Sequence, residues 1–334
     1  MSKCVLTLNG GSSSVKWGIY SVSEGVSELS AGEVEHTGGD DALFESIGRM
    51  RPDAIGHRIV HGGIDLFAPV RIDDAVVARL RLASAFAPLH GPAALALIDL
   101  AGAHYPGIAQ VACFDTGFHA DLPDIAAVLP IPKALRADGV RRYGFHGLSC
   151  ESIVAQLGTP LPERIIIAHL GSGASVTAVR DGRSVDTSMG LTPSGGVVMA
   201  TRAGDVDPGL MLYLLRERRM DVASIEDLID RQSGLLGISG RSGDLRVLHA
   251  SGDADADLAI RIFCRSIAKQ ISAMLAVLGG ADLIVFTGGI GEHDAAVRMA
   301  IRADLAFAGP IEFRTIASQE NAQIARHVGR TLAF

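Results

Sequence analysis

The sequence has no tract of Lys and Arg and no apolar run long enough to cross a bilayer. Its 30 Lys and Arg are outnumbered by 37 Asp and Glu, which gives a formal net charge of -7. Nucleic-acid-binding proteins normally carry a basic face, so we expect no nucleic-acid partner. The most apolar long stretch, Ile271–Phe286, is broken by two glycines and Asp282, and it is too short for a membrane span. We therefore expect no membrane partner either.

Cysteine is scarce, and its four residues are scattered with no C-x-x-C spacing, as Cys4, Cys113, Cys150 and Cys264. This pattern favours reduced thiols over a disulfide framework or a zinc site. The first residues, MSKCVLTLNGG, lack the apolar core of a signal peptide. Together these absences predict a cytoplasmic protein.

The composition is that of a packed globular chain, with 48% hydrophobic and 20% charged residues. Its 334 residues favour two domains. In each half strands come first and helices follow, which predicts a duplicated α/β unit. The expected strands are Val5–Leu8, Val15–Tyr20, an edge strand within Glu24–Gly39, Ala54–Val60, Ile108–Phe114, Ile165–Leu170 and Leu283–Phe286, and the expected helices are Pro88–His104, Leu148–Leu157, Gly209–Arg218 and Ala254–Leu278.

Two segments resemble each other, one in each half. Val5–Tyr20 reads VLTLNGGSSSVKWGIY and Ile165–Val179 reads IIIAHLGSGASVTAV. Each predicts a β-hairpin with a tip of small residues. Backbone N–H groups at such a tip can converge on an anion, so two tips facing each other would hold a polyphosphate. The P-loop pattern G-x-x-x-x-G-K-[ST] is absent.

Charged residues lie at the ends of two of the expected buried strands. Arg58 lies at the end of one strand, where a guanidinium needs an anionic partner. That partner is either a structural carboxylate or a bound carboxylate or phosphate, which arginine binds with two hydrogen bonds. Asp115 ends the next strand, where a carboxylate either orients a cation and its water or caps a turn.

Several loops combine glycine with charged or aromatic residues. His146 lies within RRYGFHG, and Arg202 lies in the irregular segment 190–209, where a cation could stabilise phosphoryl charge. Long irregular segments in compact domains are often functional. The segments Gly240–Arg246 and Gly288–His293 are expected to be Gly-rich turns, either of which could hold a nucleoside.

Nine motifs in order along the chain resemble those of the acetate kinases. They are NGGSSSVK, GHRIVHGG, APLHGP, FDTGFH, RRYGFHGLS, HLGSGASV, DTSMGLTPSGGVVMATRAGDVDPG, SGLLGISG and FTGGIGE. The resemblance implies a duplicated ribonuclease-H-like (actin-like ATPase) α/β fold with an active-site cleft between two domains. We expect residues 1–117, joined by the tail 322–334, to form one domain and residues 118–321 to form the nucleotide-binding domain. The family also implies ATP and Mg²⁺ (or Mn²⁺), acetate as the acceptor and a homodimer.

The resemblance also implies roles for individual residues. Asp115 would be the catalytic carboxylate, His146 and Arg202 would stabilise the transition state, and Arg58 would bind the substrate carboxylate. Asn9 and Glu320 would belong to the metal site, and the acyl pocket would consist of Val60, Leu89, Phe145 and Pro193. The expected nucleotide-binding residues are Ser12, Ser14, Lys16, His169, Leu170, Gly171, Ser172, Gly173, Asp244, Leu245, Arg246, Gly289, Ile290, Gly291, Glu292 and His293.

The chain also departs from the family pattern. Gly10, Gly91, Ser172 and His293 stand where the family usually has Ala, Asn, Asn and Asn, and Asn321 stands where it has a second Glu. The stretches before Ala54 and between Arg298 and Glu320 are shorter than is typical.

The substrate expected from these residues is acetate, because the four pocket residues are bulky. An additional methylene changes selectivity by only about 10–200-fold, so propionate should be a poor substrate. The alternatives are a propionate or butyrate kinase, a sugar-type kinase with Asp115 as base, a nucleotide-gated interaction module and an inactive ATP-binding paralogue.

Overall fold

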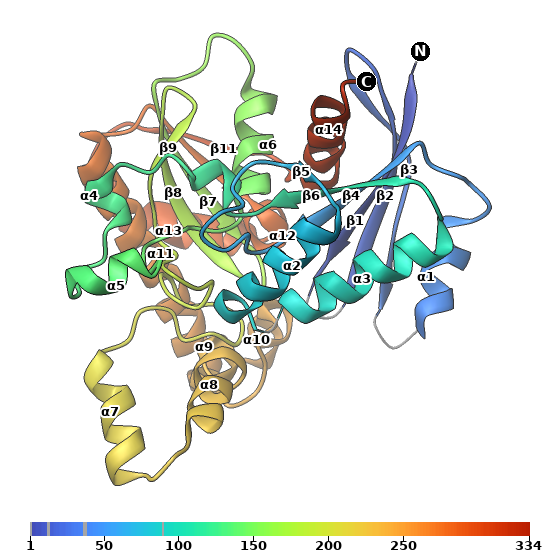
Figure 1. The fold of residues 1–334 in the computed structure, drawn as a ribbon. Helices are drawn as coiled ribbons and strands as arrows, with labels where there is room; N and C mark the ends of the chain where they lie inside the picture. Colours follow the sequence, from blue (N-terminus) through green and yellow to red (C-terminus); the bar gives the residue numbers. More distant parts are fainter. Residues whose placement is uncertain (1, 12–13, 36–38, 89) are drawn as a thin grey trace. The chain divides into compact units, whose positions relative to one another are not determined.

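A computed structural model describes residues 2–11, 14–35, 39–88 and 90–334 of the chain (Figure 1). The chain divides into two compact units. Unit 1 comprises Met1–Ala120, Phe145–Gln156 and Gln319–Phe334, and unit 2 comprises Asp121–Gly144 and Leu157–Ser318. The division into folding domains after residues 117 and 321 stays a prediction.

Unit 1 is built on a six-stranded sheet with the strand order β3-β2-β1-β4-β6-β5. β1 pairs antiparallel with β2 and parallel with β4, and β4 pairs parallel with β6. The strands are β1 Lys3–Gly10, β2 Ser14–Val22, β3 Val26–Glu35, β4 Ala54–Ile59, β5 Val70–Arg71 and β6 Ala109–Phe114.

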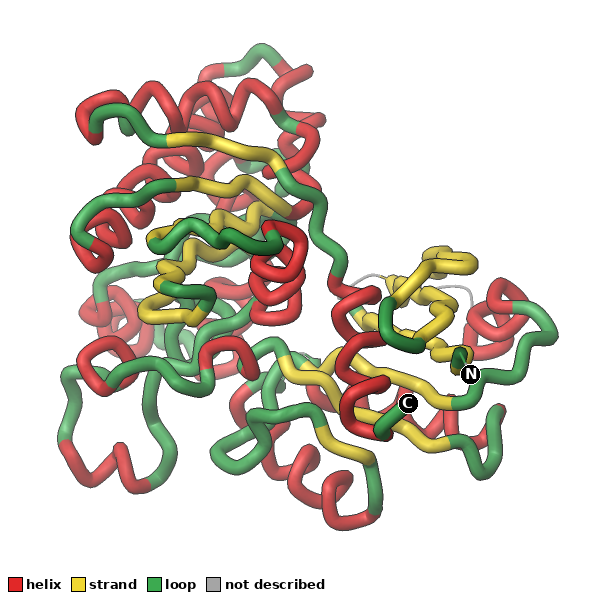
Figure 2. Tube along the Cα trace, turned by 90° about the horizontal axis from the view of Figure 1, so that it is seen from above, coloured by secondary structure: helices red, strands yellow, loops and turns green. Residues whose placement is uncertain are grey.

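Helices pack on both faces of this sheet because its strands alternate apolar side chains between the two sides. Leu6 lies in a core cluster with residues of α1 and α3, whereas its neighbour Val5 clusters with residues of α14. Figure 2 shows α14, the helix that leads to the C-terminus, lying across the strands. The helices of unit 1 are α1 Gly39–Ile47, α2 Asp74–Ala83, α3 Gly91–His104, α6 Gly147–Leu157 and α14 Glu320–Leu332, with short 3₁₀ turns at Ser84–Phe86 and Gly117–His119.

Unit 2 repeats the core pattern of unit 1. Its five-stranded sheet has the order β11-β10-β7-β8-β9, in which β7, β8 and β9 are antiparallel neighbours and β10 and β11 continue in parallel from β7. The same arrangement of three antiparallel and then parallel strands occurs in unit 1, so the expected duplication of an α/β unit is confirmed. The strands are β7 Arg164–Leu170, β8 Ala174–Arg180, β9 Arg183–Thr187, β10 Leu283–Thr287 and β11 Glu312–Thr315.

The longest helix of unit 2, α11, covers one face of its sheet. Asp253 caps its first turn by accepting a hydrogen bond from the Ala256 N–H. Phe263, Ile267 and Ile271 recur at four-residue intervals and are buried, as expected for one face of a helix. The helices of unit 2 are α4 Asp124–Ala127, α5 Lys133–Ala137, α7 Pro208–Glu217, α8 Val222–Arg231, α9 Gly234–Ser239, α10 Leu245–Ser251, α11 Ala254–Leu278, α12 Gly288–His293 and α13 Ala295–Asp304, with a 3₁₀ turn at Ala306–Ala308.

Most expected elements are present, and α11 has the predicted bounds. Of the two expected Gly-rich turns, Gly288–His293 is wrong, because it forms α12. Residues 240–244 are irregular as expected, and α10 begins at Leu245, with its first turn capped by Asp244. In α12 the Glu292 carboxylate accepts hydrogen bonds from the Gly288 and Ser318 N–H groups, which stabilises a helix in spite of its glycines. Among the described residues, no helix is both long and apolar enough to cross a membrane.

Candidate active site

An ion pair joins the ends of two adjacent parallel strands in unit 1. Arg58 lies near the end of β4, and Asp115 follows β6 directly. The Arg58 Nε and Nη2 atoms lie 2.8 and 2.6 Å from Asp115 Oδ2. The Asp115 side chain is 1% exposed and that of Arg58 is 15% exposed. The carboxylate partner expected for Arg58 is therefore Asp115, and the same pair lies at the strand edge where α/β sheets bind ligands.

Asn9 and Glu320 extend this pair into a network of four side chains. Asn9 lies near the end of β1, and Glu320 is the first residue of α14. The Asn9 amide donates a hydrogen bond of 2.8 Å to Glu320 Oε2 and accepts one of 3.3 Å from Arg58 Nη1. The two residues assigned to a metal site thus lie beside the residue assigned to the substrate carboxylate.

The charges of this network influence one another strongly. Burial lowers the pKa of the Arg58 guanidinium, but Asp115 and Glu320 raise it by more, so Arg58 stays charged. Burial is also the largest influence on Asp115. It raises the pKa of this carboxyl to about 6, helped by Glu320 and opposed by Arg58. The cluster holds one cation between two acidic groups.

Two polar groups in the network remain open. Asp115 Oδ1 is buried and has no hydrogen-bond partner among the described residues. Arg58 directs its N–H groups to Asp115, Asn9 and the Gly10 carbonyl, and no described residue accepts from its remaining terminal N–H. A buried acceptor and a donor without partners mark a place for a further group.

The oxygen atoms of Asn9, Asp115 and Glu320 fit a hydrated Mg²⁺. This ion prefers hard oxygen ligands, keeps several waters and uses one or two carboxylates. The open Asp115 Oδ1 could accept a hydrogen bond from such a water. Within the described ranges, no cluster of three or more His, Cys, Asp and Glu side chains could ligate a metal on its own, so water or phosphate would complete the coordination.

His146 is held in an unusual conformation next to Asp115. Its φ is 57° and its side chain is buried, a backbone state that costs energy for a non-glycine residue. The Gly147 N–H donates a hydrogen bond of 2.8 Å to the Asp115 carbonyl. His119 Nε2 lies 3.0 Å from the Phe145 carbonyl on the other side. These two contacts fix the segment that carries His146.

Sequence reasoning missed His119 and His57. Both are fully buried, and burial lowers the pKa of each to about 4. His119 belongs to the motif FDTGFH, which drew attention only to Asp115. A hydrogen bond to a main-chain carbonyl 26 residues away leaves no pattern in the sequence.

The expected acyl-pocket residues are divided between the units. Val60 and Phe145 are buried in unit 1, and the Phe145 ring centroid lies 5.7 Å from that of His61. Pro193 belongs to unit 2, where its carbonyl accepts a hydrogen bond of 3.2 Å from Arg202 Nη1. Leu89 and Ser12 lie outside the described residues.

Both predicted hairpins are present. In unit 1, β1 pairs with β2 so that Asn9 lies opposite Lys16, whose side chain is exposed. The Ser14 hydroxyl donates a hydrogen bond to Glu33. In unit 2, the turn Gly171–Gly173 closes with a 2.9 Å hydrogen bond from the Gly171 N–H to the Gly173 carbonyl.

The turn of the second hairpin lies next to the segment that contains Arg202. The Ala200 N–H donates a hydrogen bond of 3.1 Å to the Ser172 carbonyl. His169 and Leu170, at the end of β7, are buried. Unit 2 thus places His169–Gly173 and the Arg202 segment side by side.

The remaining expected nucleotide residues lie on α10 and α12. Gly289 and His293 are exposed. The Glu292 carboxylate accepts hydrogen bonds of 3.0 and 2.9 Å from the Gly288 and Ser318 N–H groups, so it also stabilises the helix start. Asp244 and Arg246 form a salt bridge of 2.6 Å with each other, and Leu245 is buried.

Comparison with known proteins identifies close relatives. The model of the acetokinase family matches residues 46–325. The acetate kinase of Rhodopseudomonas palustris (strain ATCC BAA-98 / CGA009) is 38% identical over 392 aligned positions, covering 99% of this chain and 98% of that protein. The crystal structure of Porphyromonas gingivalis acetate kinase has a TM-score of 0.86 at 32% identity, covering 99% of this chain and 100% of that one. A propionate kinase from Francisella tularensis subsp. tularensis SCHU S4 has the same TM-score at 34% identity, covering 97% and 98%.

The alignment with the R. palustris protein spans 392 positions, whereas this chain has 334 residues. The relative therefore carries insertions that this chain lacks. Fold and sequence agree across nearly the whole chain. The chain belongs to the acetokinase family, with the duplicated actin-like ATPase fold of that family.

Proposed function

We propose that this protein transfers the terminal phosphoryl group of ATP to acetate, reversibly, giving acetyl phosphate and ADP. Acetate is ionised at neutral pH because carboxylic acids titrate near pH 4–5. The acceptor therefore needs no general base, and the difficulty is to bring two anions together. Correctly placed cations are the main requirement of such a reaction.

The observation that carries this proposal is the network around Arg58. It has a guanidinium that is 15% exposed and a neighbouring buried carboxylate oxygen without a partner in the described part of the chain. We assign acetate binding to Arg58. Asp115 orients Arg58 and metal-bound water, and does not abstract a proton. The sugar-type alternative needs a base for a hydroxyl acceptor, whereas Asp115 is already paired with Arg58.

Asn9, Asp115 and Glu320 are proposed to hold Mg²⁺ (or Mn²⁺) through water. The ion would supply charge neutralisation at the β- and γ-phosphates. Asn9 keeps Glu320 in place through their 2.8 Å hydrogen bond. Asp115 offers Oδ1 to a water while Arg58 occupies Oδ2.

We assign stabilisation of the transferred phosphoryl group to His146 and Arg202. The strained backbone at His146 is held from both sides by Asp115 and His119 contacts, as expected for a group that must be preorganised. ATP is assigned to the small-residue turns and to the starts of α10 and α12. The residues are Ser12, Ser14, Lys16, His169, Leu170, Gly171, Ser172, Gly173, Asp244, Leu245, Arg246, Gly289, Ile290, Gly291, Glu292 and His293.

We propose acetate over propionate because Val60, Leu89, Phe145 and Pro193 are bulky. The similar propionate kinase makes propionate the second candidate. Trapping of acyl phosphate with hydroxylamine tests both, with Mg-ATP and parallel acetate, propionate, butyrate and glycerol. Acetate should give the highest kcat/KM. A higher kcat/KM for propionate than for acetate would identify propionate as the preferred substrate. ATP binding without acyl phosphate from any acid would contradict the proposal.

We also propose that the protein is a cytoplasmic homodimer. α7 has no buried residue, and it exposes Leu210, Leu212, Tyr213 and Leu215 by 38–48%. Several large apolar side chains exposed on one helix are typical of an interface. Light scattering at micromolar concentration should give twice the mass of one 34.9 kDa chain, and a monomer would contradict this assignment.

A further inference from the structure

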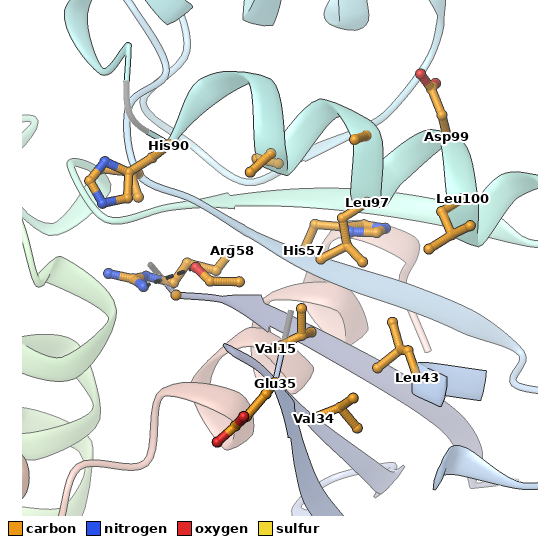
Figure 3. Close-up of a pocket in the computed structure, with 16 residues that line it drawn as sticks. Val15, Val34, Glu35, Leu43, His57, Arg58, His90, Leu97, Asp99 and Leu100 are labelled. Carbon is orange, nitrogen blue, oxygen red and sulfur yellow. Dashed lines mark hydrogen bonds between the residues drawn. The ribbon is translucent and has the colours of Figure 1, made fainter. Parts of the chain in front are cut away.

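Unit 1 contains a cavity of about 580 Å³ between α3 and the sheet (Figure 3). Its walls are apolar side chains from four elements: Val15, Val34, Leu43, Leu97 and Leu100. Figure 3 shows these side chains turned toward one another, with Arg58 at the opposite end from Leu43 and Leu100. The volume is within the range of pockets that bind small organic molecules.

The cavity is continuous with the place assigned to acetate, because Arg58 and Val60 line both. From Arg58 the space continues along α3, whose Leu97 and Leu100 line it.

The apolar walls of the cavity are not sealed from water. Val34, Leu97 and Leu100 pack against the buried core yet remain partly exposed. Glu35 and Asp99 also line the cavity, but Figure 3 shows both carboxylates pointing away from the apolar side chains. Arg58 is thus the charged side chain at the end of an apolar cavity. This arrangement complements an acid with an alkyl chain.

His57 also lines the cavity, and its side chain is 1% exposed. Nε2 lies 2.6 Å from Gln110 Oε1, while Nδ1 has no partner in the described segments. A buried polar atom without a partner is costly, and a bound water beside the alkyl chain would satisfy it.

We propose that this cavity binds the alkyl chain of medium-chain carboxylic acids, about six to ten carbons long, whose carboxylate Arg58 holds in place of acetate. The inference rests on the proposed role of Arg58 as the carboxylate-binding residue. Such acids compete with acetate for the enzyme. Each methylene that leaves water contributes about 0.8 kcal/mol, or roughly a fourfold gain in affinity.

The test measures the binding of butanoate, hexanoate and octanoate to the full-length protein by titration calorimetry. Affinity should rise about fourfold per methylene, and octanoate should raise the KM for acetate with kcat unchanged. A flat series from butanoate to octanoate would overturn the proposal, as would inhibition by octanoate that acetate cannot relieve.

Leu97→Phe places a larger side chain in the cavity, and its matched control is Leu82→Phe. Leu97→Phe should weaken octanoate binding by about tenfold or more while the KM for acetate stays within about twofold. Leu82→Phe makes the same change on α2, where Leu82 is 78% exposed, and should bind octanoate like the wild type. Equal octanoate affinity in Leu97→Phe and wild type would also overturn the proposal.

The two proposals fail separately. Wild-type protein that binds octanoate but forms no acetyl phosphate would contradict only the proposed reaction. If Leu97→Phe does not fold, the chain-length series on the wild type still decides the inference.

Discussion

Asn9 and Glu320 are 311 positions apart in the sequence and are joined by a hydrogen bond of 2.8 Å. The bond is possible because α14 returns to unit 1 and packs on the face of the sheet that carries Gly56 and Arg58. At Gly56, a Cβ would lie 2.7 Å from a Val328 methyl group, so glycine allows the close approach of the helix. The end of the chain thus delivers an acidic group to the network around Arg58.

The Arg58–Asp115 pair should show strong coupling in stability. Arg58→Met leaves a buried carboxylate without its cation, which should lower the free energy of unfolding by about 3–5 kcal/mol. The double variant Arg58→Met with Asp115→Leu removes both charges, so its free energy of unfolding should decrease clearly less than that of Arg58→Met alone. Urea unfolding of the two single variants, the double variant and the wild type measures this. Strictly additive losses would show that the two side chains do not act as a pair.

Asp115 should set the acidic limb of the activity profile. Burial raises the pKa of its carboxyl to about 6, so the charged form that orients Arg58 is lost as the pH falls through 6. The kcat/KM for acetate should therefore decrease below about pH 6. In Asp115→Asn, activity should fall by about 10²–10⁴-fold. The remaining activity should no longer decrease below about pH 6. Near-wild-type turnover would remove Asp115 from the mechanism.

His57 and His119 should make the fold sensitive to acid. Burial lowers the pKa of each to about 4 from an ordinary value of 6.5. Between these values the unfolded chain binds more protons than the folded one, so stability is full above pH 6.5 and falls as the pH drops toward 4. Each histidine should contribute a slope of about 1.4 kcal/mol per pH unit at most. Urea unfolding at several pH values gives the free energy of unfolding as a function of pH. This free energy should change less steeply with pH in His57→Leu than in the wild type, and an equally steep change would refute the prediction.

His119 should act as a positioning residue for His146. His119→Phe loses the hydrogen bond to the Phe145 carbonyl and should reduce kcat by about 10–100-fold, with little change in the KM for ATP. His119→Gln can donate to the same carbonyl and should recover most of the loss. If both variants lose kcat equally, the role of His119 is packing and not orientation.

Divalent metal should be required, and Glu320 should tune its affinity. Treatment with EDTA should abolish acetyl phosphate formation, and Mg²⁺ or Mn²⁺ should restore it. Glu320→Gln keeps the size of the side chain but removes its charge, so it should raise the Mg²⁺ concentration for half-maximal activity by about tenfold or more. The neighbouring Gln319→Glu serves as the matched control. An unchanged requirement in Glu320→Gln would exclude Glu320 from the metal site.

The sequence predicted the parts of the fold that depend on local patterns. Alternating apolar residues and small-residue turns located both hairpins, and the four-residue spacing of apolar residues located α11. The helix α12 was missed because a tertiary contact, Glu292 with Ser318, overrides the local glycines. The start of α10 falls two residues inside the expected turn because Asp244 caps it. His57 and His119 were missed because their partners lie far away in the sequence.

Arg58 is proposed to hold the carboxylate that receives the phosphoryl group directly. ³¹P NMR of the purified protein with Mg-ATP and acetate, for the wild type and Arg58→Gln, tests this transfer. We expect an acetyl phosphate signal that grows with ADP in the wild type and grows about 10²–10³-fold more slowly in Arg58→Gln. Inorganic phosphate as the sole product, or equal rates in both proteins, would rule out direct transfer to a carboxylate held by Arg58.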